Sequence, residues 1–291
     1  MKKHLVFIVN PRSGTSRIKE IQSAINTTLN QEEFSYELLH TKYRNHGTNL
    51  AKEAAAKGAF AVVAVGGDGS VNDVVGGIVG TQTALAIIPR GSGNGMARNI
   101  GLPLNDTACI EVINRMQVVP TDIAFANDHP YISNAGVGFD ALIAKEFTKS
   151  KKRGLRAYSW LVTKHLWGYK APEWKITVDG KKLRERAFMV NAANGQQFGY
   201  NFTIAPQASY TDGLLDLIII RPFPKMLGGG LVFRAMKGDL TQSRYVKHYR
   251  CREVTVSHPE LQLMQTDGDA YACNNKVTFR VEPRALGVLM P

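Results

Sequence analysis

The sequence predicts an α/β N-terminal domain built on a parallel sheet, followed by a mostly β domain. Three observations lead to this fold class. Over the first 120 residues, short apolar runs alternate with segments of helical spacing. From about residue 123 onward, strand-like runs separated by turn sequences dominate. The 291 residues, 44% hydrophobic and 21% charged, have the composition of a globular chain that can bury one large core or two ordinary ones.

The first domain is predicted to span residues 1–122. Its expected strands cover residues 4–10, 36–41, 60–65 and 84–88, and its expected helices cover residues 16–30, 46–57, 71–79, 94–100 and 107–114. In the first helix, Ile18, Ile21, Ile25 and Leu29 recur at helical spacing, and Gly58 ends the second. Strands that alternate with helices favour a parallel sheet covered on both faces.

The second domain is predicted to span residues 123–291. Turn signals such as Asp179-Gly180 separate short strands, which are expected at residues 176–178, 187–191, 215–220, 253–256, 261–265 and 276–281. One helical insertion is expected at about residues 140–169.

Charge and cysteine content narrow the possible surroundings. Three widely separated cysteines argue against a disulfide framework or a zinc site, so a reducing cytoplasm is expected. No apolar run reaches the length of a membrane span. A formal charge of +12 implies acidic partners, which are nucleic acid, an anionic membrane surface or phosphorylated small molecules.

Three polar, glycine-containing loops follow predicted strands. They read Asn-Pro-Arg-Ser-Gly at residues 10–14, Gly-Gly-Asp-Gly-Ser at 66–70 and Pro-Arg-Gly-Ser-Gly-Asn-Gly at 89–95. In a parallel sheet, ligands collect at the carboxyl ends of strands, where glycines let amides approach a phosphate and helix N-termini add positive partial charge. Arg12 and Arg90 are candidates to neutralise the phosphates. Each loop alone is an ordinary turn, but three at equivalent positions predict a nucleotide site.

The commonest nucleotide sites are excluded. The chain contains no Gly-Lys-Ser or Gly-Lys-Thr, and neither glycine-rich loop has the full dinucleotide-binding spacing. Thr41 and Lys42 stand where a dinucleotide-binding domain carries an acidic residue. Protein-kinase signatures are also missing.

The three loops together resemble the diacylglycerol kinase catalytic-domain family. That family includes bacterial lipid kinases, sphingosine kinases and ceramide kinases, and is more distantly related to NAD kinases and phosphofructokinases. The resemblance continues through Asn-Ala-Gly-Val-Gly-Phe-Asp at residues 134–140, Asp-Gly-Leu-Leu-Asp at 212–216 and Asp-Gly-Asp at 267–269. It implies an NAD kinase-like first domain that binds ATP, a C-terminal β-sandwich, and a lipid headgroup that enters between them.

The resemblance also implies the site residues. ATP would be bound by Asn10, Pro11, Arg12, Ser13, Gly14, Thr41, Gly66, Gly67, Asp68, Gly69, Ser70, Asn72, Gly91, Ser92, Gly93 and Asn94. Asp267 would be the general base, with Asp269 assisting, and Asp68 and Asp216 would bind magnesium. From the residues alone, Asp68 is nearly as well suited to cap the helix expected to open at Ser70, and Asp-Gly-Asp is more often a plain turn. Asp216 has the alternative of a plain residue at a strand turn.

The acceptor is less well specified than the nucleotide. Gly95 stands where many diacylglycerol kinases carry Asp, which brings the loop closer to the sphingosine and ceramide kinases. The substrate is therefore expected to be diacylglycerol or a sphingoid lipid. The alternatives are a soluble-alcohol kinase such as an NAD kinase, and a non-catalytic nucleotide or lipid sensor. A nucleic-acid-binding protein ranks last, and a homodimer is left open.

A helix predicted at residues 155–169 carries two tryptophans, Trp160 and Trp167, and follows the basic run at residues 149–153. Aromatic rings mixed with cations are typical of segments that lie at the headgroups of an anionic membrane. This favours peripheral association with the inner face of the membrane. The alternative is that the tryptophans pack against the protein and the lysines are merely solvated.

Overall fold

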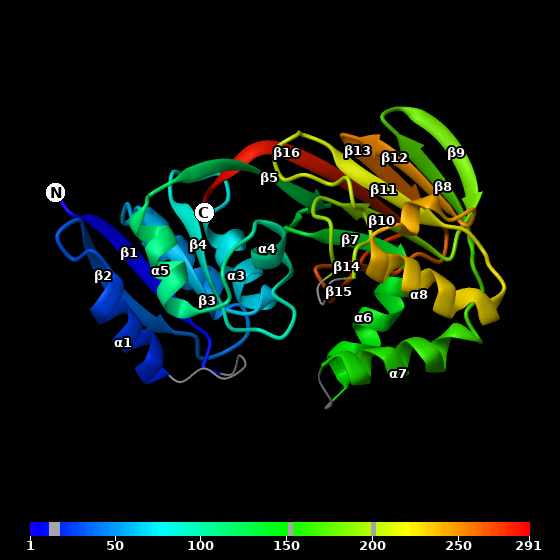
Figure 1. Cartoon of the computed structure of the whole chain (residues 1–291). Coiled ribbons are helices and arrows are strands. Elements are labelled where there is room, and N and C mark those ends of the chain that lie inside the picture. Colours follow the sequence, from blue (N-terminus) through cyan, green and yellow to red (C-terminus); the bar gives the residue numbers. More distant parts are fainter. Residues whose placement is uncertain (12–17, 151–153, 199–201) are drawn as a thin grey trace. The chain divides into compact units, whose positions relative to one another are not determined.

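The computed structural model describes residues 1–11, 18–150, 154–198 and 202–291, which form two compact units (Figure 1). Unit 1 comprises Met1–Ile123 and Pro283–Pro291, and unit 2 comprises Ala124–Glu282. The last nine residues were predicted to lie in the second domain, but in the structure they lie in unit 1. They belong to unit 1 because Leu286, Val288 and Leu289 are buried in its core.

Unit 1 is built on a parallel sheet in the order β2-β1-β3-β4. The strands are β1 (Lys3–Val9), β2 (Phe34–His40), β3 (Ala61–Gly66) and β4 (Ala84–Pro89). The last part of β16 (Lys276–Leu289) lies parallel to β4, with Val288 opposite Leu85. β3 and β4 are apolar at nearly every position because a sheet covered on both faces buries both sets of side chains.

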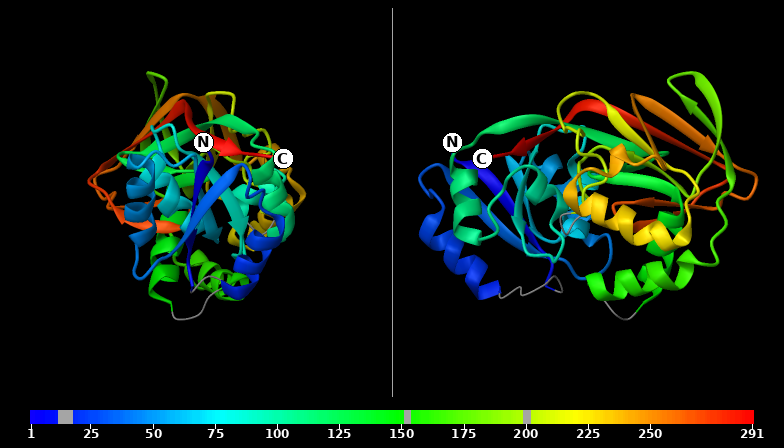
Figure 2. Two further views of the ribbon diagram at one scale, coloured as in Figure 1. Left: turned by 90° about the vertical axis from the view of Figure 1, so that its left-hand side faces the viewer. Right: turned by 45° about the vertical axis from the view of Figure 1, so that its right-hand side comes forward.

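Helices cover both faces of this sheet (Figures 1 and 2). α1 (Ile18–Thr28) and α5 (Asp106–Asn114) share one core cluster with the strands, while α2 (His46–Ala56) and α3 (Asp68–Ile78) pack together on the other face. A β-carbon on Gly77 would lie 2.6 Å from the β-carbon of Ala51, so glycine permits the close approach of α2 and α3. A five-residue helix, α4 (Gly95–Asn99), follows β4.

Unit 2 is an antiparallel β-sandwich. One layer contains β13 (Glu253–Ser257), β8 (Glu173–Val178), β9 (Lys181–Arg186) and the first part of β16. The end of β5 (Val118–Ala126) and β6 (His129–Tyr131) belong to the same layer. The other has the order β12-β11-β10-β7-β14-β15, with bounds Val246–Cys251, Leu215–Ile220, Met189–Ala193, Asn134–Gly138, Leu263–Thr266 and Asp269–Ala272. Tyr131, Trp174 and Phe279 fill the space between the layers. The predicted fold class is thus confirmed.

Three helices pack on the outer face of the second layer, where they share a core cluster with β10 and β11 (Figure 1). They are α6 (Phe139–Lys149), α7 (Leu155–Leu166) and α8 (Gly228–Lys237), with the short helices η1 (Lys225–Leu227) and η2 (Leu240–Gln242) on either side of α8. α6 and α7 fall in the expected insertion. α8 was not predicted, because it begins with three glycines that have low helix propensity. Within the described ranges, no helix has the length and apolar character needed to cross a bilayer.

Candidate active site

The second and third glycine-containing loops touch through their backbones. A β-carbon on Gly91 would lie 2.4 Å from Cα of Gly67, and one on Gly67 would lie 3.0 Å from Cα of Gly91. The amide of Arg90 donates to the carbonyl of Gly66 at 2.7 Å, which continues the pairing of β3 with β4 into the loops. Glycine is therefore required at residue 91 for the two loops to meet, whatever ligand they hold.

Side chains fix the shape of the third loop. Asn94, which has a left-handed backbone (φ 50°), bonds to Gly91 twice: its Oδ1 accepts from the amide at 2.9 Å and its Nδ2 donates to the carbonyl at 2.8 Å. Oδ1 of Asp68 accepts from the amide of Gly95 at 2.6 Å. Burial raises the pKa of Asp68, while amide hydrogen bonds from Gly95 and its neighbours partly offset this. Asp68 therefore caps a helix, which was the alternative to magnesium binding. The helix that it caps is α4, which follows the third loop, and not α3, in which Asp68 itself lies.

The first loop meets the second at the carboxyl ends of β1 and β3. The amide of Asn10 donates to the carbonyl of Val65 at 3.2 Å, and its Nδ2 donates to Oγ of Ser70 at 3.4 Å. The amide of Thr41 donates to the carbonyl of Val9 at 3.0 Å, which places Thr41 at the same edge of the sheet. The structure therefore brings Asn10, Thr41 and Ser70 together at the edge that the sequence predicts.

The remaining predicted ATP contacts differ in how well they are placed. Gly69, the second residue of α3, is exposed and Asn72 is half-buried in α3, while in the third loop Ser92 is exposed and Gly93 is buried. Pro11 follows β1 and is exposed. Arg12, Ser13 and Gly14 lie outside the described residues.

Arg90 has a different role from the predicted one. Its Nε donates to Oδ1 of Asp106 at 3.1 Å, its Nη2 pairs with the other oxygen of Asp106, and its Nη1 lies 3.6 Å from Oε2 of Glu20. The guanidinium is nearly buried among these groups. Arg90 therefore ties α1 and α5 to the end of β4, and the expectation that it neutralises a phosphate is corrected.

In unit 2, the carboxylate of Asp267 accepts hydrogen bonds from three successive backbone amides. These belong to Ile132 (2.7 Å, to Oδ2), Ser133 (2.8 Å, to Oδ1) and Asn134 (3.0 Å, to Oδ1). Asp267 (φ 47°) and Gly268 (φ 88°) both have left-handed backbones and form the two-residue turn between β14 and β15. Asp269 follows as the half-buried first residue of β15. Asp267 thus anchors the start of β7 to this turn.

A buried polar network, which the sequence analysis did not identify, lies behind the turn. Oδ2 of Asp140 accepts from Nδ2 of Asn191 (3.2 Å) and Nε2 of Gln265 (3.3 Å), and Oε1 of Gln265 accepts from the amide of Gly268 (2.9 Å). Burial raises the pKa of Asp140 to about 7, against the opposing effect of these bonds. A β-carbon on Gly136 would lie 2.3 Å from Oδ2 of Asp140, which explains a glycine in the motif at residues 134–140.

Two models of known protein families match the chain. The model of the diacylglycerol kinase catalytic domain matches residues 4–126, and that of the YegS C-terminal NAD kinase beta sandwich-like domain matches residues 133–290. The chain belongs to the diacylglycerol kinase family. The match to the second domain alone covers more than half of the chain.

Individual members of the family are similar over much of their length. A Chromohalobacter salexigens protein named "Probable lipid kinase YegS-like" is 33% identical over 62% of this chain, and the chain spans 60% of that protein. A Bacillus subtilis diacylglycerol kinase is 26% identical over 92% of this chain and 90% of its own. A diacylglycerol kinase structure from Bacillus anthracis superposes with a TM-score of 0.74 at 20% identity, covering 100% of this chain and 97% of the other. An NAD kinase from Archaeoglobus fulgidus in complex with ATP shares the fold with a TM-score of 0.56 at 16% identity, covering 98% of this chain and 93% of the other.

The diacylglycerol kinase family implies magnesium, and the two predicted ligands lie in different units. Asp216, in β11, is fully buried, and one of its carboxylate oxygens bonds to Nε2 of His248. Its other oxygen, Oδ2, is buried and has no hydrogen-bond partner among the described residues. A buried polar atom without a partner calls for an explanation, and a bound cation would be one. No cluster of three or more His, Cys, Asp or Glu side chains is present in the described part of the chain. Asp68 and Asp216 are thus single carboxylates, one in each unit, and the described residues form no closed protein cage for a metal ion.

Proposed function

We propose that this kinase-family protein transfers the γ-phosphate of ATP to the hydroxyl group of a membrane lipid. The observation that carries the proposal is the backbone contact between Gly67 and Gly91 at the carboxyl ends of β3 and β4. Two loops held this closely present their amides together, next to the N-terminus of α3, and such an arrangement favours phosphate groups. Asn10 and Thr41 lie at the same edge and would border the nucleotide.

The geometry supports a division of labour between the two aspartates at residues 267–269. Asp267 uses both carboxylate oxygens to accept backbone amides, so we assign it the role of positioning the turn. Asp269, two residues further on, would accept the proton of the lipid hydroxyl. This reverses the order expected from sequence, in which Asp267 was the base. A general base needs a carboxylate oxygen within hydrogen-bond reach of the hydroxyl. Both carboxylate oxygens of Asp267 already accept hydrogen bonds from backbone amides.

Magnesium, when bound, would supply positive charge to the phosphates during transfer. Asp68 would hold it in unit 1, because its carboxylate lies between the two glycine-containing loops and can accept more bonds than the one from Gly95. Asp216 would hold a second ion in unit 2 through Oδ2, which has no partner among the described residues. The role of that ion would be structural.

The acceptor class rests on the relatives and on Gly95. The Bacillus subtilis relative is named a diacylglycerol kinase, which favours diacylglycerol. Gly95 is buried and donates to Asp68, so an Asp at this position would bring a second carboxylate close to the first. The absence of that charge keeps a sphingoid lipid as the second candidate.

The lipid acceptor also requires contact with a bilayer, and we assign α7 to this contact. Trp160 is 61% exposed and Trp167 is 64% exposed, while Leu161 is buried against unit 2. The ammonium group of Lys164 lies 5.1 Å from the centroid of the Trp160 ring. Such a face fits the headgroups of an anionic membrane, and it supports peripheral association with the inner face. Trp174 takes no part, because it lies in the sandwich core and its Nε1 donates to the carbonyl of Ala187.

One experiment separates the candidate functions. The purified chain is incubated with labelled ATP, magnesium and a panel of acceptors that contains diacylglycerol, ceramide and sphingosine in mixed micelles, together with NAD. Labelling of a lipid is the expected result. Labelling of NAD alone would replace the proposal with a soluble-alcohol kinase. Binding of ATP without any phosphorylated acceptor would instead indicate a nucleotide or lipid sensor.

A further inference from the structure

Helix α8 is apolar on both of its sides. Leu231 and Ala235, one turn apart, are buried against the second sheet layer. At 100° per residue, Phe233 and Met236 fall on the opposite side of the helix, with Val232 next to them. Phe233 is 57% exposed, Met236 is 64% exposed and Val232 is 43% exposed. A helix that is hydrophobic all round is normally buried, so the outward side of α8 indicates a missing partner.

The short helix before α8 extends this surface. Met226 is 87% exposed and Leu227 is 46% exposed. We call the five residues Met226, Leu227, Val232, Phe233 and Met236 the α8 face. An exposed hydrophobic residue alone needs no explanation, but a contiguous group marks an interaction site.

The α8 face adjoins α7. Nζ of Lys225 donates to the carbonyl of Tyr169 at 2.9 Å and also to that of Leu166, and a β-carbon on Gly228 would meet the Leu166 side chain at 3.4 Å. The start of α8 is therefore fastened to the end of α7. Among the described residues, twelve large hydrophobic side chains are exposed. Eight of them belong to α7, to Trp167 directly after it, to η1 or to α8. The exposed apolar surface is thus concentrated in one part of unit 2.

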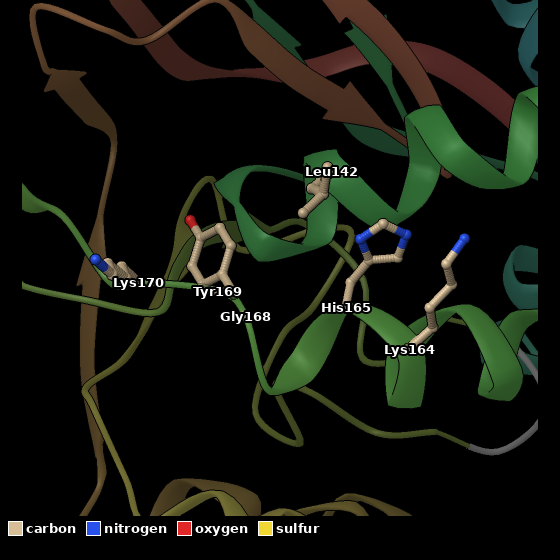
Figure 3. A pocket seen from close by; sticks show the side chains of 6 residues that line it. All are labelled: Leu142, Lys164, His165, Gly168, Tyr169 and Lys170. Carbon is tan, nitrogen blue, oxygen red and sulfur yellow. The ribbon is translucent and has the colours of Figure 1, made fainter.

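The charges of the same segments indicate the chemistry of the partner. Residues 156–170 and 221–237 contain seven Lys and Arg and no Asp or Glu. Nζ of Lys237 lies 4.7 Å from the centroid of the Phe233 ring, so an apolar group and a cation are presented together. Next to α7, a pocket of about 440 Å³ is lined by Leu142, Lys164, His165, Gly168, Tyr169 and Lys170. His165 points from α7 toward Leu142 of α6, and Lys164 extends from α7 beside it (Figure 3). Such a surface is complementary to anionic headgroups over an apolar interior.

We propose that the α8 face inserts into the headgroup region of an anionic bilayer and forms, with α7, one membrane-docking surface. The bilayer is chosen over a protein partner because residues 156–170 and 221–237 carry cations among their apolar side chains and no carboxylate; Asp239, just beyond them, pairs with Arg234 at 3.3 Å. The inference rests on the proposed function, in which the acceptor resides in a membrane. It extends that function by assigning insertion to a helix that the sequence does not predict.

The test is flotation with vesicles of phosphatidylcholine, with and without phosphatidylglycerol, in the absence of ATP and diacylglycerol. The test variant is Phe233→Ser/Met236→Ser. Its matched control is Tyr43→Ser/Leu104→Ser, which removes two side chains of unit 1 that are 59% and 50% exposed. Wild type and control are expected to bind the anionic vesicles. The test variant is expected to lose about tenfold or more of its partitioning, because two large apolar side chains no longer leave water.

Insertion is measured directly with Phe233→Trp in a Trp160→Phe/Trp167→Phe background, where Trp174 stays in the core. Brominated lipids are expected to quench the new tryptophan. The proposal is overturned if quenching is absent, if the test variant binds like the control, or if it abolishes a dimer while vesicle binding persists. In the last case the occupant is a second copy of the chain. Kinase activity on a short-chain diacylglycerol in detergent micelles should be unchanged in the test variant. If no form of the chain phosphorylates any acceptor but flotation still depends on Phe233, the kinase proposal fails and the docking surface stands.

Discussion

The carboxylate of Asp68 and the backbone amide of Gly95 are joined by a 2.6 Å hydrogen bond, so the first residue of α3 caps the short helix that follows the next strand. Together with the contact between Gly67 and Gly91, this bond makes the second and third loops a single structural element. The loops at residues 66–70 and 89–95 are separate in the sequence. A substitution in either loop is therefore expected to change the conformation of both.

Substitution of Asp68 should separate its capping role from its chemical role. Asp68→Ala removes the acceptor for the Gly95 amide, and we expect a loss of about 1 kcal/mol in the free energy of unfolding. Asp68→Asn keeps an acceptor oxygen and should retain most of that stability, while it loses kinase activity because the negative charge is gone. Urea denaturation and the micelle assay measure the two effects. Full activity of Asp68→Asn would leave Asp68 with a capping role alone.

The contact between the glycine-containing loops should tolerate no side chain at residue 91. Gly91→Ala would place its β-carbon 2.4 Å from Cα of Gly67, so we expect a lower Tm and weak ATP binding. Gly76→Ala, on α3, meets nothing closer than 3.7 Å and should be as stable as wild type or slightly more so, because alanine favours the helix.

A third variant tests the phosphate position itself. A β-carbon on Gly69 has no neighbour within 4 Å, so Gly69→Ala should leave Tm unchanged. Any loss of ATP affinity in calorimetry then reports a clash with the nucleotide rather than with the protein. Unchanged affinity would argue against phosphates at the start of α3.

The two aspartates of the β14–β15 turn should behave differently. Asp267→Ala leaves three backbone amides without their acceptor. We expect the free energy of unfolding to fall by roughly 2–5 kcal/mol, because water can solvate some of these amides in the variant. Asp269→Asn should keep the fold and abolish phosphate transfer while ATP still binds. Thermal unfolding and single-turnover kinetics distinguish the two outcomes. A fully active Asp269→Asn enzyme would return the role of base to Asp267.

Stability should fall as pH rises because of Asp140. Its pKa is raised from 3.8 to about 7 in the folded chain, so between these values the folded state binds more protons than the unfolded state. The contribution of Asp140 is therefore fully present below about pH 4, is lost as pH rises toward 7, and amounts to about 4 kcal/mol. Comparing Asp140→Asn with wild type by urea denaturation at pH 5 and pH 8 measures it. The wild type should lose more stability than the variant over this interval, and the exposed control Asp128→Asn should follow the wild type.

Local patterns were enough to predict the parallel sheet and the edge that carries the loops. The runs at β1, β3 and β4 are continuous and apolar, and each is followed at once by its polar loop. The partners of individual side chains could not be predicted in this way. Arg90 belongs to a loop whose sequence suggests phosphate binding. Its partners Asp106 and Glu20 come close to it only once α1 and α5 have packed against the sheet.

The unpredicted elements have similar causes. α8 starts with three glycines and is held by burial of Leu231 and Ala235, which overrides its low propensity. The end of β16 was misassigned because Pro283 ordinarily interrupts a strand. Here the strand continues, and the amide of the left-handed Arg284 donates to Oδ1 of Asp122 at 2.8 Å.

The return of β16 to unit 1 affects how the protein is made. The ribosome translates β1 to β4 before unit 2, but Leu286, Val288 and Leu289 join their core only after all of unit 2 has emerged. The nascent N-terminal half therefore exposes the open edge of β4 and part of its apolar interior throughout the synthesis of the sandwich. Its native sheet is completed only by a segment that is translated after the whole sandwich.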